Sequence, residues 1–167
     1  TAYGGTGLWM QVDHTQQEQV KALFERVERE QGRLDILVND LTGDGYADWV
    51  GFLEHSLDKG LKVLETGVHS HIINAYYGVP LMLRSGGNLI VEMTDGIDIT
   101  EIRTSMFYYS LEKSFVIRLA MGLADDLRNK NVAVVALSPG FMRSEEVLDV
   151  LGVREENGVI SVIVPTF

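Results

Sequence analysis

Tyr109 and Lys113 lie four residues apart in a segment with helical periodicity. Residues at this spacing share one face of a helix, about one turn apart. A phenol is a poor base near neutral pH, and a neighbouring ammonium favours its phenolate form. Such a tyrosine can accept a proton when an alcohol loses a hydride and donate one when a carbonyl is reduced. The pair indicates acid–base chemistry of this kind, although a tyrosine on the surface of a helix would show the same spacing.

The elements that must position this pair predict an α/β fold. Four apolar runs predict strands: 8–12, 34–38, 88–93 and 132–137. Three segments between them predict helices: 15–32, 54–83 and 104–128. Thr15 could cap the first of these helices together with Glu18, and Gly32 would stop it. Apolar strands that alternate with helices are typical of a parallel sheet with helices on both faces.

Polar residues follow the predicted strands at the places where each strand ends. They are Asp13, Asn39, Thr94 with Asp95, and Pro139 with Gly140. In open parallel sheets, ligands bind beyond the carboxyl ends of the strands. We therefore expect these residues to surround a ligand site together with Tyr109 and Lys113.

Composition excludes several classes of function. The net charge of −10, with basic residues scattered along the chain, argues against a nucleic-acid or anionic-membrane partner. No apolar run is long enough to span a membrane, and the chain has no cysteine for disulfides or thiolate metal sites. His69 and His71 lie two apart on a predicted helix, so no metal site is expected there. A soluble cytoplasmic protein is the expectation.

Three motifs together resemble the classical short-chain dehydrogenase/reductase family. The run 12–39 (VDHTQQEQVKALFERVEREQGRLDILVN) is similar to the central stretch of these proteins. Tyr109-x-x-x-Lys113 and Pro139-Gly140-x-x-x-Ser144 resemble the family's catalytic and nicotinamide-side motifs. The resemblance covers residues 6–153. It implies a Rossmann-like, doubly wound parallel sheet and an oxidoreductase that moves a hydride between NAD or NADP and a carbonyl or secondary alcohol.

The resemblance also implies roles for individual residues. Tyr109 would be the catalytic acid/base, and Lys113 would hold the ribose hydroxyls and favour the Tyr109 phenolate. Asp13, with His14 beside it, would lie near the adenine, and Asn39 would end the strand beneath the cofactor. The carboxamide side of the nicotinamide would be lined by four further residues: Pro139, Gly140, Met142 and Ser144.

The chain departs from the family pattern at the substrate side of the site. The usual Asn-Asn-Ala-Gly is replaced by Asn39-Asp40-Leu41-Thr42. The expected serine is absent, and its strand ends in Thr94-Asp95, so that Thr94, or a protonated Asp95, would supply the hydroxyl-side donor. Counting back from Pro80, the family's catalytic asparagine position corresponds to Gly67. Activity is therefore a question separate from the fold.

The resemblance further implies that the first two βα units, with the Gly-rich phosphate-binding turn, are missing from residues 1–167. Gly4-Gly5-Thr6-Gly7 does not supply that turn, because no strand precedes it and a strand follows. In the family order 3-2-1-4-5-6, the gap falls between 8–12 and 34–38. We expect a single, N-terminally incomplete Rossmann domain, and residues 158–167 resemble an additional terminal strand.

Two alternatives remain open. A catalytically silent relative that binds a nucleotide or a partner chain would explain the lost serine and asparagine. A flavodoxin-like binding domain would leave the Tyr109/Lys113 and Pro139-Gly140 motifs unexplained. By resemblance, the long predicted helices 54–83 and 104–128 would form a homodimer or homotetramer.

Overall fold

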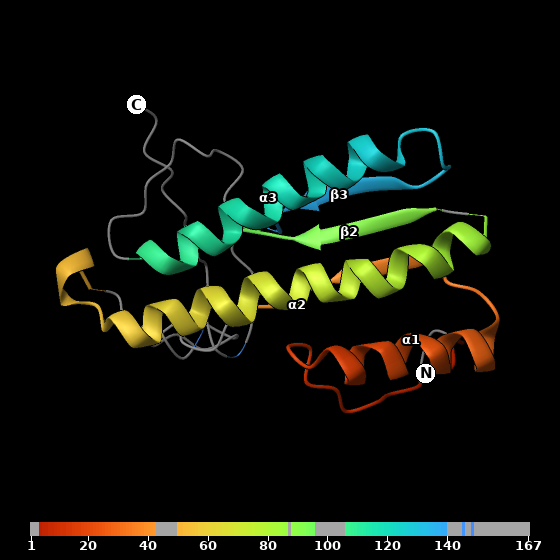
Figure 1. The fold of residues 1–167 in the computed structure, drawn as a ribbon, viewed down its shortest axis with the longest axis horizontal. Helices are drawn as coiled ribbons and strands as arrows, with labels where there is room; N and C mark the ends of the chain where they lie inside the picture. Colours follow the sequence, from red (N-terminus) through yellow and green to blue (C-terminus); the bar gives the residue numbers. More distant parts are fainter. Residues whose placement is uncertain are drawn as a thin grey trace.

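The structure is a computed structural model that describes residues 4–42, 50–86, 88–95 and 106–139, together with Glu145 and Leu148. Helices and strands alternate along these residues (Figure 1). The elements, in chain order, are α1 (Gln17–Gln31), β1 (Ile36–Asn39), the 3-10 turn η1 (Phe52–Glu54), α2 (Leu57–Arg84), β2 (Leu89–Met93), α3 (Phe107–Leu127) and β3 (Ala133–Leu137). Residues 158–167, predicted as a terminal strand, lie outside the described part.

The three strands form one parallel sheet in the order β1-β2-β3. Ile36 pairs with Leu89, and Leu89 pairs with Ala133, so the strands are in register from their first residues. All three carboxyl ends consequently lie at one edge of the sheet. The predicted α/β fold with a parallel Rossmann-type sheet is confirmed.

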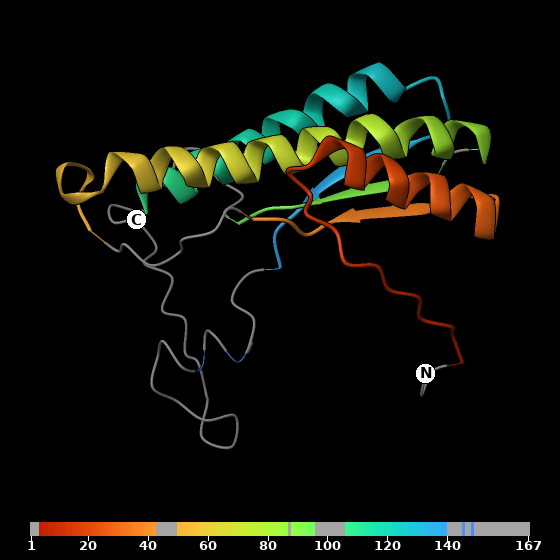
Figure 2. The ribbon, with the colours of Figure 1, turned by 60° about the horizontal axis from the view of Figure 1, so that its bottom comes forward.

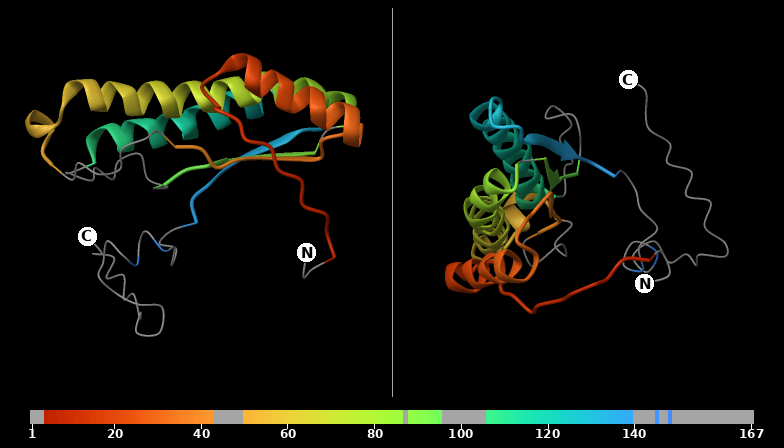
Figure 3. Two further views of the ribbon diagram at one scale, coloured as in Figure 1. Left: turned by 90° about the horizontal axis from the view of Figure 1, so that it is seen from below. Right: turned by 90° about the vertical axis from the view of Figure 1, so that its right-hand side faces the viewer.

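The described helices cover one face of this sheet, as the side and end views show (Figure 3). Alternate strand residues point toward them: Leu37 and Ile90 are buried among side chains of α1 and α2. The intervening residues point to the opposite face, where Ile36 and Val38 are exposed, as is Val135. Helices were expected on both faces of the sheet. The three α-helices of the described residues all lie on the same face.

Glycines set the close approach of the helices. A Cβ atom at Gly60 would overlap the ring of Tyr108, and one at Gly67 would overlap the Glu112 carboxyl group, 2.7 Å from its Oε2 atom. Because Gly60 and Gly67 lie seven residues apart on α2, they present one face of that helix to α3. This contact holds the N-terminal half of α3 beside α2.

The predicted strand at 8–12 is wrong. Residues 4–12 carry no strand, and the segment leading to α1 runs away from the helix layer (Figure 2). Trp9 is 83% exposed, and β1 forms one edge of the described sheet. A strand needs a partner for its backbone groups, and no described strand lies beside this segment.

The ends of α1 also differ in part from the prediction. Gly32 ends the helix in the left-handed conformation, with φ of 71°, as its position predicts. At the other end, the N-cap position belongs to Gln16, and Thr15 instead donates its backbone N–H and its hydroxyl to the side chain of Asp13. The cap predicted at Thr15 is therefore wrong by one residue, because the Asp13 turn uses that hydroxyl.

Candidate active site at the carboxyl edge of the sheet

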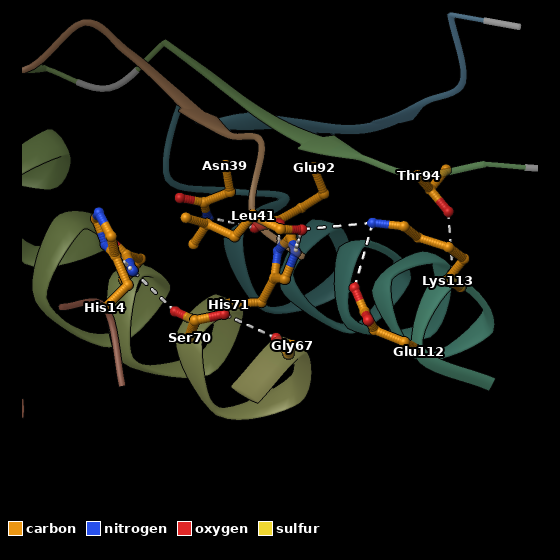
Figure 4. A network of polar contacts seen from close by, with 11 residues as sticks. His14, Asn39, Leu41, Gly67, Ser70, His71, Glu92, Thr94, Glu112 and Lys113 are labelled. Atoms are coloured by element: carbon orange, nitrogen blue, oxygen red, sulfur yellow. Dashed lines mark hydrogen bonds and ion pairs between the residues drawn. The ribbon is translucent and has the colours of Figure 1, made fainter. Parts of the chain in front are cut away.

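The predicted catalytic residues come together at the carboxyl edge of β2. Thr94 and Asp95 directly follow this strand, and Tyr109 and Lys113 lie on the first turns of α3. A helix that follows a parallel strand lies near that strand's carboxyl end, which explains how residues 14 to 19 positions apart meet. Figure 4 shows Thr94 and Lys113 side by side, with Leu41 of the β1 end facing the lysine.

Tyr109 is half-buried and contacts a carboxylate and an ammonium. Its hydroxyl donates to Oδ2 of Asp95 at 3.2 Å. The Nζ atom of Lys113 lies 5.4 Å from the centroid of its ring, within the range of a cation–π contact. Asp95 opposes the phenolate form of Tyr109 because like charges repel, whereas Lys113 favours it.

Lys113 is buried, and two further groups hold its ammonium. Its Nζ atom lies 3.2 Å from Oε1 of Glu112, whose side chain is 0% exposed. The same atom donates to the backbone carbonyl of Leu41 at 3.4 Å. An ammonium has three N–H donors, so these two contacts among the described residues leave a donor for a ligand hydroxyl.

Thr94 fastens β2 to its neighbours. Its hydroxyl donates to the backbone carbonyl of Lys113 at 3.0 Å, and its backbone N–H donates to Leu137 at 2.9 Å. Its side chain is buried. In this arrangement, the hydroxyl hydrogen of Thr94 is directed at α3, and Asp95 is the residue that contacts Tyr109.

Behind this edge, a buried polar chain joins β1, β2 and α2. The amide of Asn39 donates to Oε1 of Glu92 at 2.8 Å, and Oε2 of Glu92 lies 2.6 Å from Nδ1 of His71. The Nε2 atom of His71 lies 3.0 Å from the Leu41 carbonyl. The side chain of Asn39 thus faces the helix layer, where it orients Glu92.

The acceptor at Leu41 determines which nitrogen of His71 carries a proton. A carbonyl only accepts, so Nε2 donates to Leu41, and Nδ1 faces the carboxyl group of Glu92. The same Leu41 carbonyl accepts from Lys113 (Figure 4). His71 therefore fixes the backbone at the end of β1, which in turn holds the ammonium.

Sequence reasoning missed His71, Glu92 and Glu112. All three side chains are fully buried. Glu92 gave a usable signal, since a single carboxylate inside the apolar run NLIVEM must find a partner when its strand is buried. The sequence around Glu112 gave no comparable indication that this residue is buried, because its carboxyl group packs against Gly67 of another helix, α2.

The residues predicted near the adenine lie at the start of α1. The side chain of Asp13 accepts the Thr15 hydroxyl and backbone N–H, and these bonds lower the pKa of Asp13 below its ordinary value. His14 contacts the amide of Asn74 on α2 through Nδ1 at 3.1 Å. Asp13 and His14 thus lie just before α1, whereas Tyr109 and Lys113 lie on α3.

Of the predicted nicotinamide-side residues, the structure describes only Pro139, which is exposed just beyond the end of β3. Gly140, Met142 and Ser144 lie outside the described residues. The described residues contain no group of three histidines or carboxylates close enough to hold a metal. None of their helices combines the length and apolar character that a membrane crossing needs.

Comparison with known proteins shows the family of this chain. Residues 2–150 match the family model for short chain dehydrogenases. Dehydrogenase/reductase SDR family member 1 of Mus musculus is 32% identical in an alignment of 154 positions, which covers 86% of this chain and 47% of that protein. The chain thus spans about half the length of this relative.

Two solved structures show the same fold. A short-chain dehydrogenase/reductase from Burkholderia xenovorans superimposes with a TM-score of 0.79 at 25% identity, over 90% of this chain and 58% of the other. Gluconate 5-dehydrogenase from Burkholderia cenocepacia J2315, in complex with NADP and tartrate, gives 0.73 at 20% identity, over 86% and 55%. The match over residues 2–150, the shared fold and the placement of Tyr109 and Lys113 lead to one conclusion: this chain belongs to the short-chain dehydrogenase family.

Proposed function

We propose that this chain acts as an oxidoreductase, which transfers a hydride between NAD or NADP and a carbonyl or secondary alcohol. The observation that carries the proposal is the contact of the Lys113 ammonium with the ring of Tyr109, 5.4 Å from its centroid. Both residues lie beside the carboxyl ends of β1 and β2, where ligands of such sheets bind.

The donors at this edge fit a nicotinamide nucleotide. The ammonium of Lys113, after its contacts with Glu112 and Leu41, has an N–H suited to ribose hydroxyls. Pro139 begins the second predicted cofactor motif, and the solved relative from Burkholderia cenocepacia holds NADP. The nucleotide would supply or accept the hydride, which no side chain of the protein can do.

The protein would supply the proton and its electrostatic environment. During carbonyl reduction, Tyr109 would donate its hydroxyl hydrogen to the substrate oxygen, and Lys113 would stabilise the resulting phenolate. Asp95 accepts that hydrogen at 3.2 Å in the present structure, so it holds the tyrosine hydroxyl until a substrate oxygen takes its place. During alcohol oxidation, the phenolate would take the proton back.

A second candidate is a catalytically silent relative that binds a nucleotide or a partner chain. The Asp95 carboxylate beside the Tyr109 hydroxyl favours it, because a negative charge there opposes the developing phenolate and a substrate oxyanion. If the silent relative binds a nucleotide, it differs from the first candidate only in the absence of turnover. Assembly into a homodimer or homotetramer remains a proposal that light scattering tests.

Titration with NADH and NADPH, followed by nicotinamide fluorescence, tests the proposal. We expect saturable binding of at least one nucleotide, and weaker binding after Lys113→Met. Lys130→Met, which removes an exposed lysine beyond α3, is the matched control and should leave the affinity unchanged. Binding of neither nucleotide by the folded protein would contradict the oxidoreductase and would leave the silent relative that binds a partner chain.

A further inference from the structure

Gly67 and Glu112 share one space between α2 and α3. Gly67 is buried, and a Cβ atom added there would lie 2.6 Å from Cγ and 2.7 Å from Oε2 of Glu112. Such approaches are far closer than van der Waals contact allows, so a side chain at position 67 would displace the carboxyl group. Glu112 therefore occupies the place beside α2 that any larger residue at position 67 would fill.

A fully buried carboxylate is unfavourable unless a cation balances it. The side chains of Glu112 and Lys113 are 0% and 8% exposed, and their Oε1 and Nζ atoms lie 3.2 Å apart. At the other close approach, the space beside Gly60 is filled by the ring of Tyr108, which needs no cation. An apolar side chain could fill the space beside Gly67 equally well, so what distinguishes Glu112 is its contact with Lys113.

We propose that Glu112 is a positioning residue that holds the Lys113 ammonium from the side of α2, an inference that rests on the proposed function of Lys113. The Leu41 carbonyl holds the same ammonium from the side of β1, and the ring of Tyr109 lies against it. These contacts direct the remaining donor of Lys113. Glu112 acts through Lys113 and requires glycine at position 67.

The requirement for glycine is tested by thermal unfolding of four proteins: the wild type, Gly67→Ala, Glu112→Ser and the double variant. Gly67→Ala alone should lower the Tm by roughly 3–10 °C, because it overpacks a buried site. In the Glu112→Ser background, the space is open, and the same Gly67→Ala change should leave the Tm unchanged or raise it. An equal loss of Tm in both backgrounds would overturn the inference that position 67 and the Glu112 side chain compete for one space.

The role of the carboxylate is tested by nucleotide affinity. Glu112→Leu keeps the side-chain size and removes the negative charge beside the ammonium, so it should weaken NADH or NADPH binding about 10-fold. Glu112→Gln keeps the shape and a polar oxygen at this place and should lose less. In the Lys113→Met background, Glu112→Leu should have no further effect on affinity, whereas a merely structural role would give the same loss in both backgrounds and overturn the proposal.

A readout that needs no nucleotide separates the failure of this inference from failure of the proposed function. Glu112→Leu and Lys113→Met should each lower the Tm, and the double variant should lose less than the two single losses added together, because neither charge is left buried alone. Additive losses would overturn the ion pair. If the wild-type protein binds neither nucleotide while the coupling is present, the proposed function fails and the Glu112–Lys113 contact stands.

Discussion

The Nδ1 atom of His71 and the Oε2 atom of Glu92 lie 2.6 Å apart, and neither side chain is exposed to solvent. Glu92 also accepts from the amide of Asn39, and His71 also donates to the Leu41 carbonyl. The contact thus joins two neighbouring strands to α2 at the edge where Lys113 lies. A buried pair of this kind makes the end of β1 dependent on two side chains that are distant in sequence.

Replacement of His71 by Leu should destabilise the protein strongly. The change leaves Glu92 buried without its histidine, which costs about 3–5 kcal/mol in comparable pairs. The free energy of unfolding, measured by urea denaturation, should fall by this amount. His69→Leu is the matched control: His69 lies on the same helix and is exposed, so its loss should change stability by less than about 0.5 kcal/mol. Similar effects of the two variants would contradict the buried chain.

Two helical glycines should respond oppositely to alanine. At Gly60 the new Cβ atom would overlap the Tyr108 ring, and overpacking of this kind costs about 1–3 kcal/mol. At Gly122 in α3, nothing within 4 Å meets the new atom, so Gly122→Ala should stabilise by about 0.5–1 kcal/mol through helix propensity. Denaturation curves of the two variants check the prediction, and a stabilising Gly60→Ala would contradict the close approach of α2 and α3.

Asp13 should make one helix start sensitive to acid. Its hydrogen bonds from Thr15 lower its pKa in the folded state, so its contribution to stability is present above the unfolded value, which is about 4, and is lost as pH falls through the lower folded value. The stability difference between wild type and Asp13→Asn should therefore shrink between about pH 5 and pH 2. Asp126→Asn, at an exposed site in α3, should show no such trend. A pH-independent difference for Asp13→Asn would contradict this account.

Asp95 should disfavour alcohol oxidation near neutral pH. Its carboxylate accepts the Tyr109 hydroxyl hydrogen, and its negative charge opposes the phenolate that takes the substrate proton. Asp95→Asn removes this charge with little change of shape, so the acid limb of the rate–pH profile for oxidation should move to lower pH. Measurement of kcat/KM for alcohol oxidation against pH, in the wild type and in Asp95→Asn, tests this prediction. An unshifted profile would show that Asp95 does not govern the tyrosine.

The order of helices and strands could be predicted from the sequence because apolar runs and their spacing depend on local chemistry. The strand predicted at 88–93 begins one residue later, as β2, and the helix predicted to stop at Gly32 does so in the left-handed conformation. The strand predicted at 8–12 failed because strand formation requires a neighbour, which a local pattern cannot show.

The candidate site could be predicted only in part. Tyr109 and Lys113 have a recognisable spacing, and their contact follows from one helix. The partnership of Glu112 with Gly67 depends on how closely α2 approaches α3, and that of His71 with Glu92 depends on which face of α2 meets β2. Such contacts arise from tertiary packing, which explains why the polar chain behind the catalytic pair escaped prediction.

The central claim is that Tyr109 serves as the acid/base in hydride transfer, and one comparison tests it most directly. Oxidation of NADH or NADPH by wild type and by Tyr109→Phe would be followed with a panel of aldehydes and ketones at nucleotide concentrations that saturate both proteins. We expect turnover of at least one carbonyl by wild type, and a loss of about 100-fold or more in Tyr109→Phe, while nucleotide affinity is retained. Equal turnover in both proteins, or no turnover by a wild-type protein that binds nucleotide, would contradict the account.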